Sequence, residues 1–263
     1  LSAAGCLSVL TLNQTPVTLM EKVKGICEEA FDEVLDKMNR NYARFLEATH
    51  QPVHKLPWSR KVVDFMTLYE EAKAAGGEAF EREYRSELKT LQQKLENNEM
   101  TLLDCNFALL DFVYGYITDL SPRVVYGLIP PYYPNVSNRF ITGLAPQIRS
   151  LDVDLDRFTR ERFGQHYVSE EFYTGISDLS YTSISNSEEI SAALSKSMPF
   201  YGTLYDIAIS DIETISMPCI NIGPWGKDFH KLTERVLKRD LCERTPAIIQ
   251  HAIGLVLADG DRQ

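Results

Sequence analysis

Residues 217–236 read MPCINIGPWGKDFHKLTERV, and this stretch gives the clearest indication of the fold. An apolar run, residues 219–222, leads into a Gly-Pro-Trp-Gly loop that is followed by His230. Short apolar runs bounded by glycine and proline are typical of buried strands. Because ligands often bind just beyond the carboxyl ends of strands in α/β sheets, we predict a strand that delivers a functional loop.

The side chains of this loop allow two interpretations. Gly223 and Gly226 permit backbone conformations and close approaches that residues with a Cβ resist. His230 and Glu234 are four residues apart, so they share a face if the loop continues into a helical turn. A single histidine near a loop is, however, more often a hydrogen-bonded structural residue than a metal ligand. Spacing alone therefore does not identify a metal site.

The rest of the chain predicts strands that alternate with helices, which indicates an α/β fold. The clearest prediction is a helix that begins near Thr18. Thr18 and Glu21 have the spacing of a capping box, and apolar residues recur at helical intervals after them. A break at Pro122 suggests a boundary near residue 120, between domains of residues 1–120 and 121–263. The expected strands are 5–12, 61–66, 124–129, a run that ends at 171–173, and 219–222. The expected helices are a long helix from residue 18 that the prolines of residues 50–58 break, solvated charged segments within 68–98, and helices over 101–118, 139–163 and 246–257.

Composition and charge restrict the classes of partner. The 263 residues are 44% hydrophobic, enough for one large domain or two smaller domains with real cores. A formal net charge of -10 disfavours nucleic acid and anionic membrane surfaces, so small molecules or proteins are the expected partners. Five scattered cysteines without a CxxC spacing predict reduced thiols in the cytoplasm. The chain starts at Leu1 in a strand-like run, so we expect it to continue a longer protein.

Three short motifs carry a resemblance to a known family. Residues 223–236 (GPWGKDFHKLTERV) resemble the C-terminal signature of the dizinc metallopeptidase-type hydrolases that include aminoacylase, carboxypeptidase G and succinyl-diaminopimelate desuccinylase. Residues 175–181 (GISDLSY), 130–134 (PPYYP) and 221–228 (NIGPWGKD) resemble the branch named for the arginine utilization protein RocB. The similarity extends over most of the chain and is poor over residues 135–165.

This resemblance implies a fold and an activity. Residues 1–120 would form an α+β lid that mediates a homodimer, and residues 121–263 would form the closing half of the zinc-binding α/β domain. In such enzymes, two zinc ions polarise the scissile carbonyl and lower the pKa of a bound water. The whole protein would cleave an amide bond in an N-acyl amino acid or a short peptide, with an arginine-derived amide suggested by the name of the branch.

The resemblance also assigns residues. His230 falls on the last zinc ligand of the family, and Glu234 on a glutamate that orients the ligand or supports its loop. Ser177 and Asp178 fall on a pair that lines the substrate cleft, and Gly223 and Gly226 of the signature are also assigned to substrate binding. The HxD motif, the bridging aspartate and the glutamate general base of the family precede the lid, so no catalytic residue is expected in this chain. The chain alone should be inactive.

Two alternatives stay open. His50 and His54 have the HxxxH spacing of some zinc sites, but Pro52 interrupts the helix that this spacing requires. The protein could also retain the hydrolase fold without metal binding and act as an interaction or dimerisation protein. Upstream sequence with an intact HxD motif and glutamate pair would favour the enzyme.

Overall fold

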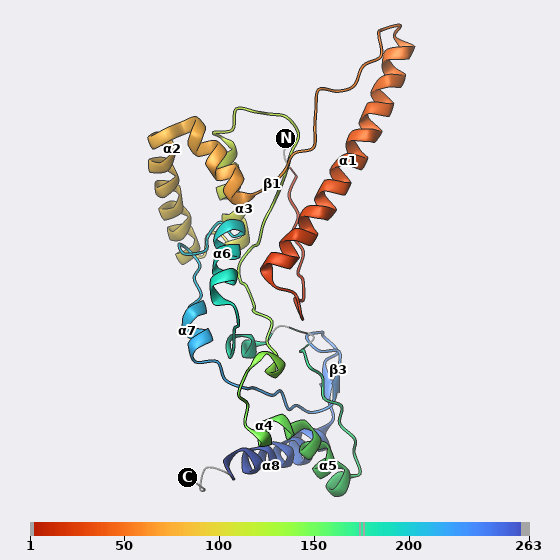
Figure 1. Ribbon diagram of the computed structural model, residues 1–263, viewed down its shortest axis with the longest axis vertical. Coiled ribbons are helices and arrows are strands. Elements are labelled where there is room, and N and C mark those ends of the chain that lie inside the picture. The colour runs from red at the N-terminus through yellow and green to blue at the C-terminus, as the bar shows by residue number, and fades with distance from the viewer. Residues whose placement is uncertain (1–2, 174, 176, 259–263) are drawn as a thin grey trace. The chain divides into compact units, whose positions relative to one another are not determined.

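The computed structural model describes residues 3–173, 175 and 177–258. The chain divides into two compact units, each assembled from two segments: unit 1 is Leu1–Asn135 with Asn186–Asp211, and unit 2 is Val136–Ser185 with Ile212–Gln263. Helices and short strands occur in both units (Figure 1), so the predicted mixture of α and β structure is confirmed. The assignment of residues 1–120 to a lid and 121–263 to a hydrolase domain stays a prediction.

Unit 1 begins with the long helix α1 (Pro16–Ala48). Its N-cap is Thr15, whose side chain accepts a hydrogen bond from the Thr18 amide while the Thr18 side chain accepts one from Thr15. The predicted cap at Thr18 is therefore wrong by three residues, because Pro16 is well suited to the first turn of a helix. The helix ends at Ala48, just before residues 50–58, whose prolines predicted the break.

Two short strands of unit 1 pair in parallel. β1 (Val62–Asp64) and β2 (Val124–Tyr126) align Val62 with Val124, which confirms both predicted strands in shortened form. Asp64 ends β1 and caps the following helix, α2 (Phe65–Glu96), by accepting a 2.8 Å hydrogen bond from the Thr67 amide. α2 bends at Gly77, whose φ of 57° is readily adopted only by glycine (Figure 1).

The core of unit 1 lies between the bent α2 and α3 (Leu102–Tyr114), which confirms the predicted buried helix. Phe80 occupies its centre and contacts the rings of Tyr69, Tyr84, Phe112 and Tyr116. The expectation that residues 68–98 form purely solvated helices is thus wrong. One face of α2 is fully buried even though the remainder is charged, because its few large apolar residues recur on that face.

The last elements of unit 1 are α6 (Ser187–Ser197) and the segment after β2. The carbonyl of Ser197 accepts a 2.8 Å hydrogen bond from the Leu128 amide. The PPYYP motif also lies here, where the Tyr132 amide donates a 2.9 Å hydrogen bond to the Tyr205 hydroxyl oxygen. This motif therefore contributes to packing within unit 1. The short helix α7 (Ile209–Thr214) follows and leads into unit 2.

Unit 2 is built around the helices α5 (Leu151–Phe163) and α8 (Thr245–Leu257), which pack through Leu151, Leu155, Ile248 and Ala252. The predicted helix over 246–257 is confirmed. The predicted helix over 139–163 is instead divided into short pieces and α5, since glycine and proline interrupt it. The remaining elements are η1 (Asn138–Phe140), α4 (Pro146–Arg149), η2 (Asp178–Tyr181), β3 (Gly226–Lys227), β4 (Arg235–Val236) and the π-helical turn η3 (Asp240–Arg244).

Three predicted strands, 5–12, 171–173 and 219–222, do not form regular strands. At residue 219 the reason is visible, because the side-chain amide of Asn138 exchanges two hydrogen bonds, of 2.8 and 2.9 Å, with the backbone of Cys219. This side chain takes the place that a neighbouring strand would have. Within the part of the chain that the structure describes, no helix has the length and apolar character needed to cross a membrane.

Candidate functional site

The loop that carries His230 is the turn of a small antiparallel hairpin in unit 2. β3 pairs Gly226 with Val236 of β4. A Cβ placed at Gly226 would lie 2.9 Å from the carbonyl oxygen of Arg235, so this position requires glycine. At Gly223 a Cβ would meet open space, so the close approach expected there is not seen among the described residues.

His230 stands at the exposed tip of this loop. Its backbone φ is 58° and that of Asp228 is 59°, so both adopt the left-handed conformation that histidine and aspartate tolerate better than most residues. The loop does not continue into the helical turn that would place His230 and Glu234 on one helical face. Glu234 nevertheless reaches His230, because its carboxylate accepts a 3.3 Å hydrogen bond from the His230 amide.

The imidazole of His230 stacks on the ring of Phe229, with ring centroids 4.0 Å apart. Among the described residues, none forms a hydrogen bond with its ring nitrogens. The side chain is exposed. The imidazole is therefore accessible for a ligand role.

Asp228 holds the loop in this conformation. Its carboxylate accepts a 3.0 Å hydrogen bond from the Thr233 hydroxyl and forms an ion pair with the Arg235 guanidinium. Its carbonyl accepts a 2.9 Å hydrogen bond from the Lys231 amide. The loop is thus braced by its own residues, with Asp228 on one side of His230 and Glu234 on the other.

The base of the hairpin is attached to the start of α8. The buried carboxylate of Asp240, in η3, accepts hydrogen bonds from the Trp225 amide at 3.2 Å and from the Arg244 guanidinium at 2.7 Å. The Leu237 amide donates to the Trp225 carbonyl at 2.9 Å. Asp240 was not singled out from the sequence, because its partner Trp225 lies fifteen positions away in a loop.

The predicted substrate-binding pair lies on another loop of unit 2. Ser177 caps η2, and its hydroxyl accepts a 3.3 Å hydrogen bond from the Leu179 amide, while Asp178 is exposed in the first turn. Within the described residues, neither side chain forms a hydrogen bond with the His230 loop. Ile176, in the same GISDLSY motif, lies outside the described residues.

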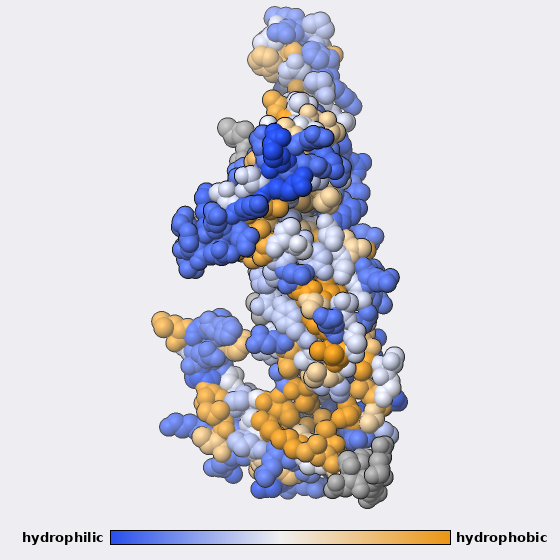
Figure 2. Space-filling view, turned by 90° about the vertical axis from the view of Figure 1, so that its left-hand side faces the viewer, coloured by the Kyte–Doolittle hydropathy of each residue, from blue (hydrophilic) through white to orange (hydrophobic). Residues whose placement is uncertain are grey.

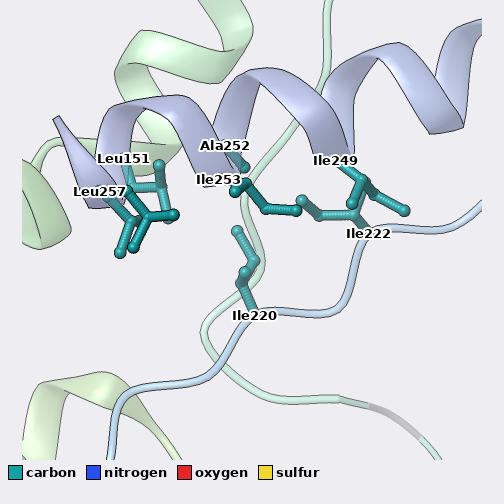
Figure 3. Close-up of a pocket in the computed structure, with 8 residues that line it drawn as sticks. Leu151, Ile220, Ile222, Ile249, Ala252, Ile253 and Leu257 are labelled. Carbon is teal, nitrogen blue, oxygen red and sulfur yellow. The ribbon is translucent and has the colours of Figure 1, made fainter.

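An apolar hollow of about 400 Å³ lies beside the run that leads into the hairpin. Ile220 and Ile222 of this run face Ile249 and Ile253 of α8, and Leu257 and Leu151 close one end (Figure 3). Figure 2 shows a broad hydrophobic surface in the lower part of the view. Since the lining is apolar, the hollow suits hydrophobic contact rather than the chemistry of a charged substrate.

Three other histidines have their rings engaged. His54 is within hydrogen-bonding distance of the Tyr42 hydroxyl and the Pro52 carbonyl, so the HxxxH spacing does not make a metal site. His251 stacks on Phe158 with ring centroids 4.0 Å apart. His166 lies 2.7 Å from the carboxylate of Asp156.

The carboxylate of Asp156, the partner of His166, has a lowered pKa. The Tyr167 amide, the Arg160 guanidinium and His166 all donate to it and lower its pKa to about 2. The Asp156 carboxylate therefore holds the segment after α5 against the helix. No sequence signal pointed to the Asp156–His166 pair, because the two residues are ten positions apart and only the turn after α5 brings them together.

The arrangement of the histidine, cysteine, aspartate and glutamate side chains shows whether they could hold a metal ion. Over residues 3–173, 175 and 177–258, no group of three or more histidine, cysteine, aspartate or glutamate side chains is arranged to hold a metal ion. His230 fits the role of one contributed ligand, because its ring is exposed and unbonded. The other ligands of a zinc site would have to come from elsewhere in a longer polypeptide or a partner.

Comparison with known proteins gives two relatives, both from Bacillus subtilis (strain 168). No family model and no solved structure matches the chain. "Uncharacterized protein YqjN" is 24% identical over 265 residues, which cover 99% of this chain and 45% of that protein. "Protein RocB" is 23% identical over 238 residues, which cover 90% of this chain and 41% of that protein. This chain is similar to RocB. It spans less than half the length of either relative.

Proposed function

We propose that the chain forms the C-terminal part of a zinc-dependent amide-bond hydrolase that acts on an N-acyl amino acid or a short peptide. Cytoplasmic arginine or amino-acid catabolism is the proposed setting. The similarity to RocB supports this proposal, together with the motif around His230. The observation that carries it is the imidazole of His230, exposed and unbonded within the described residues, on a loop whose two left-handed residues are held by side-chain contacts. Strained backbone of this kind often occurs at functional sites.

In this proposal His230 holds one zinc ion through a ring nitrogen. Glu234 fixes the backbone of His230, and Asp228 with Arg235 fixes the turn before it, so both act by positioning the imidazole. The chemistry that bound zinc would supply is polarisation of a carbonyl and a lower pKa for a bound water. Ser177 and Asp178 are proposed to contact the substrate, and the general base is proposed to lie outside this chain.

A test uses the full-length protein that contains this chain, assayed on a panel of N-acyl amino acids with added zinc. His230→Ala should lower hydrolysis by at least about a hundredfold, as loss of a metal ligand does. His54→Ala is the matched control, because within the described residues its ring lies at hydrogen-bonding distance from Tyr42 and Pro52, and it should retain activity. Equal activity of wild type and His230→Ala would remove His230 from the site.

The second candidate function is a non-catalytic interaction protein. The observation that favours it is the apolar face of α8, where Ile249, Ile253 and Leu257 are exposed beside the hollow of Figure 3. Absence of zinc-dependent hydrolysis across the whole panel by the wild-type protein would favour this candidate.

A further inference from the structure

The hairpin that carries His230 is held in place by hydrogen bonds rather than by packing. Its residues from Trp225 to Val236 are exposed, except for Asp228, which is half-buried. Burial of apolar surface therefore contributes little to fixing the hairpin on unit 2. Its position depends instead on the contacts at its base, where the chain enters at Trp225 and leaves at Leu237.

Both backbone groups of Trp225 are hydrogen-bonded at this base. The carbonyl accepts a 2.9 Å hydrogen bond from the Leu237 amide, which closes the hairpin on itself. The amide donates a 3.2 Å hydrogen bond to the Asp240 carboxylate. Among the described residues, Asp240 is the one side chain outside residues 225–236 that forms a hydrogen bond with the hairpin. A single carboxylate thus attaches the hairpin to the turn that precedes α8.

Asp240 is itself firmly placed. It is 4% exposed, and a buried carboxylate is stable only when it is well paired. Its Oδ2 atom accepts the hydrogen bond from Trp225, whereas its Oδ1 atom accepts a 2.7 Å hydrogen bond from the Arg244 guanidinium. The two oxygens therefore connect two elements, the hairpin and η3. The turn η3 is π-helical, a form that occurs frequently at functional sites.

We propose that Asp240 is the positioning residue of the His230 site. By holding the Trp225 amide, its carboxylate fixes the base of the hairpin and so the place of the imidazole five residues further along. A ligand that is already in place binds a metal ion more tightly, because no free energy is lost in ordering the loop on binding. The role toward zinc rests on the proposed function, whereas the attachment of the hairpin does not.

Two double variants isolate the hydrogen bond from Trp225. Both include Arg244→Met, so neither leaves an unpaired buried charge. Asp240→Asn/Arg244→Met keeps a side-chain oxygen that can accept a hydrogen bond from the Trp225 amide. Asp240→Leu/Arg244→Met has nearly the same side-chain shape and lacks that oxygen. Loss of the ion pair affects both variants equally, so a difference between them reports the hydrogen bond that anchors the hairpin.

The first measurement is hydrogen exchange of the full-length protein, resolved by peptide and made without added metal. Peptides that cover residues 224–237 should exchange at least about tenfold faster in Asp240→Leu/Arg244→Met than in the wild type. In Asp240→Asn/Arg244→Met their exchange should stay within about threefold of the wild type. Exchange in α5 should change in neither variant. Equal exchange of the hairpin in the two variants would overturn the proposal, because the hairpin would then be held without the Asp240 oxygen.

The second measurement is the dissociation constant of the zinc ion that His230→Ala loses, obtained by competition with a chelator. It should rise about tenfold in Asp240→Leu/Arg244→Met and stay within about threefold of the wild type in Asp240→Asn/Arg244→Met. Glu243→Ala is the control and should leave the constant unchanged, because the exposed Glu243 carboxylate pairs with Arg239 at 3.3 Å.

The outcomes separate this inference from the proposed function. Zinc binding by the wild type with an unchanged constant in Asp240→Leu/Arg244→Met would overturn the role of Asp240 and leave the proposed function standing. A wild type that binds no zinc would overturn the proposed function and the role of Asp240 toward zinc. The exchange of the hairpin would then still decide whether Asp240 holds it.

Discussion

Phe80 in unit 1 is fully buried beneath four aromatic rings, whereas Ile253 on α8 of unit 2 is 53% exposed. The difference reflects two kinds of core. Around α2 and α3 the chain closes its own core on every side, with Leu68, Leu109 and Val113 at 0% exposure. One face of α8 packs against α5, and its Ile249, Ile253 and Leu257 are exposed beside the apolar hollow. Unit 1 therefore closes its α2–α3 core with its own side chains, while the second face of α8 is suited to bind a further apolar surface.

The largest effect on stability is expected at Phe80. Phe80→Ala should lower the free energy of unfolding of the α2–α3 core by about 3–5 kcal/mol, because it removes a large side chain that the surrounding rings cannot replace. Hydrogen exchange resolved by peptide should show faster exchange in α3 and unchanged exchange in α8. An equal acceleration in both helices would mean that the two cores are not stabilised separately.

A smaller effect is expected within α8 itself. Ile248 is buried against α5, so Ile248→Ala should lower the free energy of unfolding of unit 2 by about 2–4 kcal/mol. Ile253→Ala is the matched control on the open face and should change that free energy by less than about 0.5 kcal/mol. Exchange rates of α5 and α8 amides measure both. Similar losses for the two variants would show that the open face of α8 is packed in solution.

The sequence predicted those elements whose residues determine their own conformation. The buried helix over 101–118 was found because most of its residues are apolar, and the breaks at proline ended α1 and initiated the segment before β1. The prediction of a strand at 219–222 was wrong. The periodicity of the sequence cannot show that the Asn138 side chain takes the place of a strand partner. The burial of one face of α2 was not predicted, because charged residues dominate its sequence and its few large apolar residues, which share that face, are easily overlooked.

The loop around His230 was predicted from the sequence in part, as the fold was. The loop with Gly226, His230 and Glu234 was expected from sequence, and the contact between His230 and Glu234 occurs, although through a hairpin turn rather than a helix. The anchoring by Asp240 was missed, because hydrogen bonds from a buried carboxylate to a distant loop leave no periodic signal. The zinc role of His230 and the substrate roles of Ser177 and Asp178 stay predictions.

The zinc role of His230 is tested by the metal content of the full-length protein, wild type against His230→Ala, with both purified identically from zinc-containing medium. We expect about two zinc ions per chain in the wild type and the loss of at least one in the variant. His54→Ala, prepared in parallel, should keep the wild-type content. Absence of metal from the wild type, or an unchanged content in His230→Ala, would contradict the assignment of His230 as a zinc ligand.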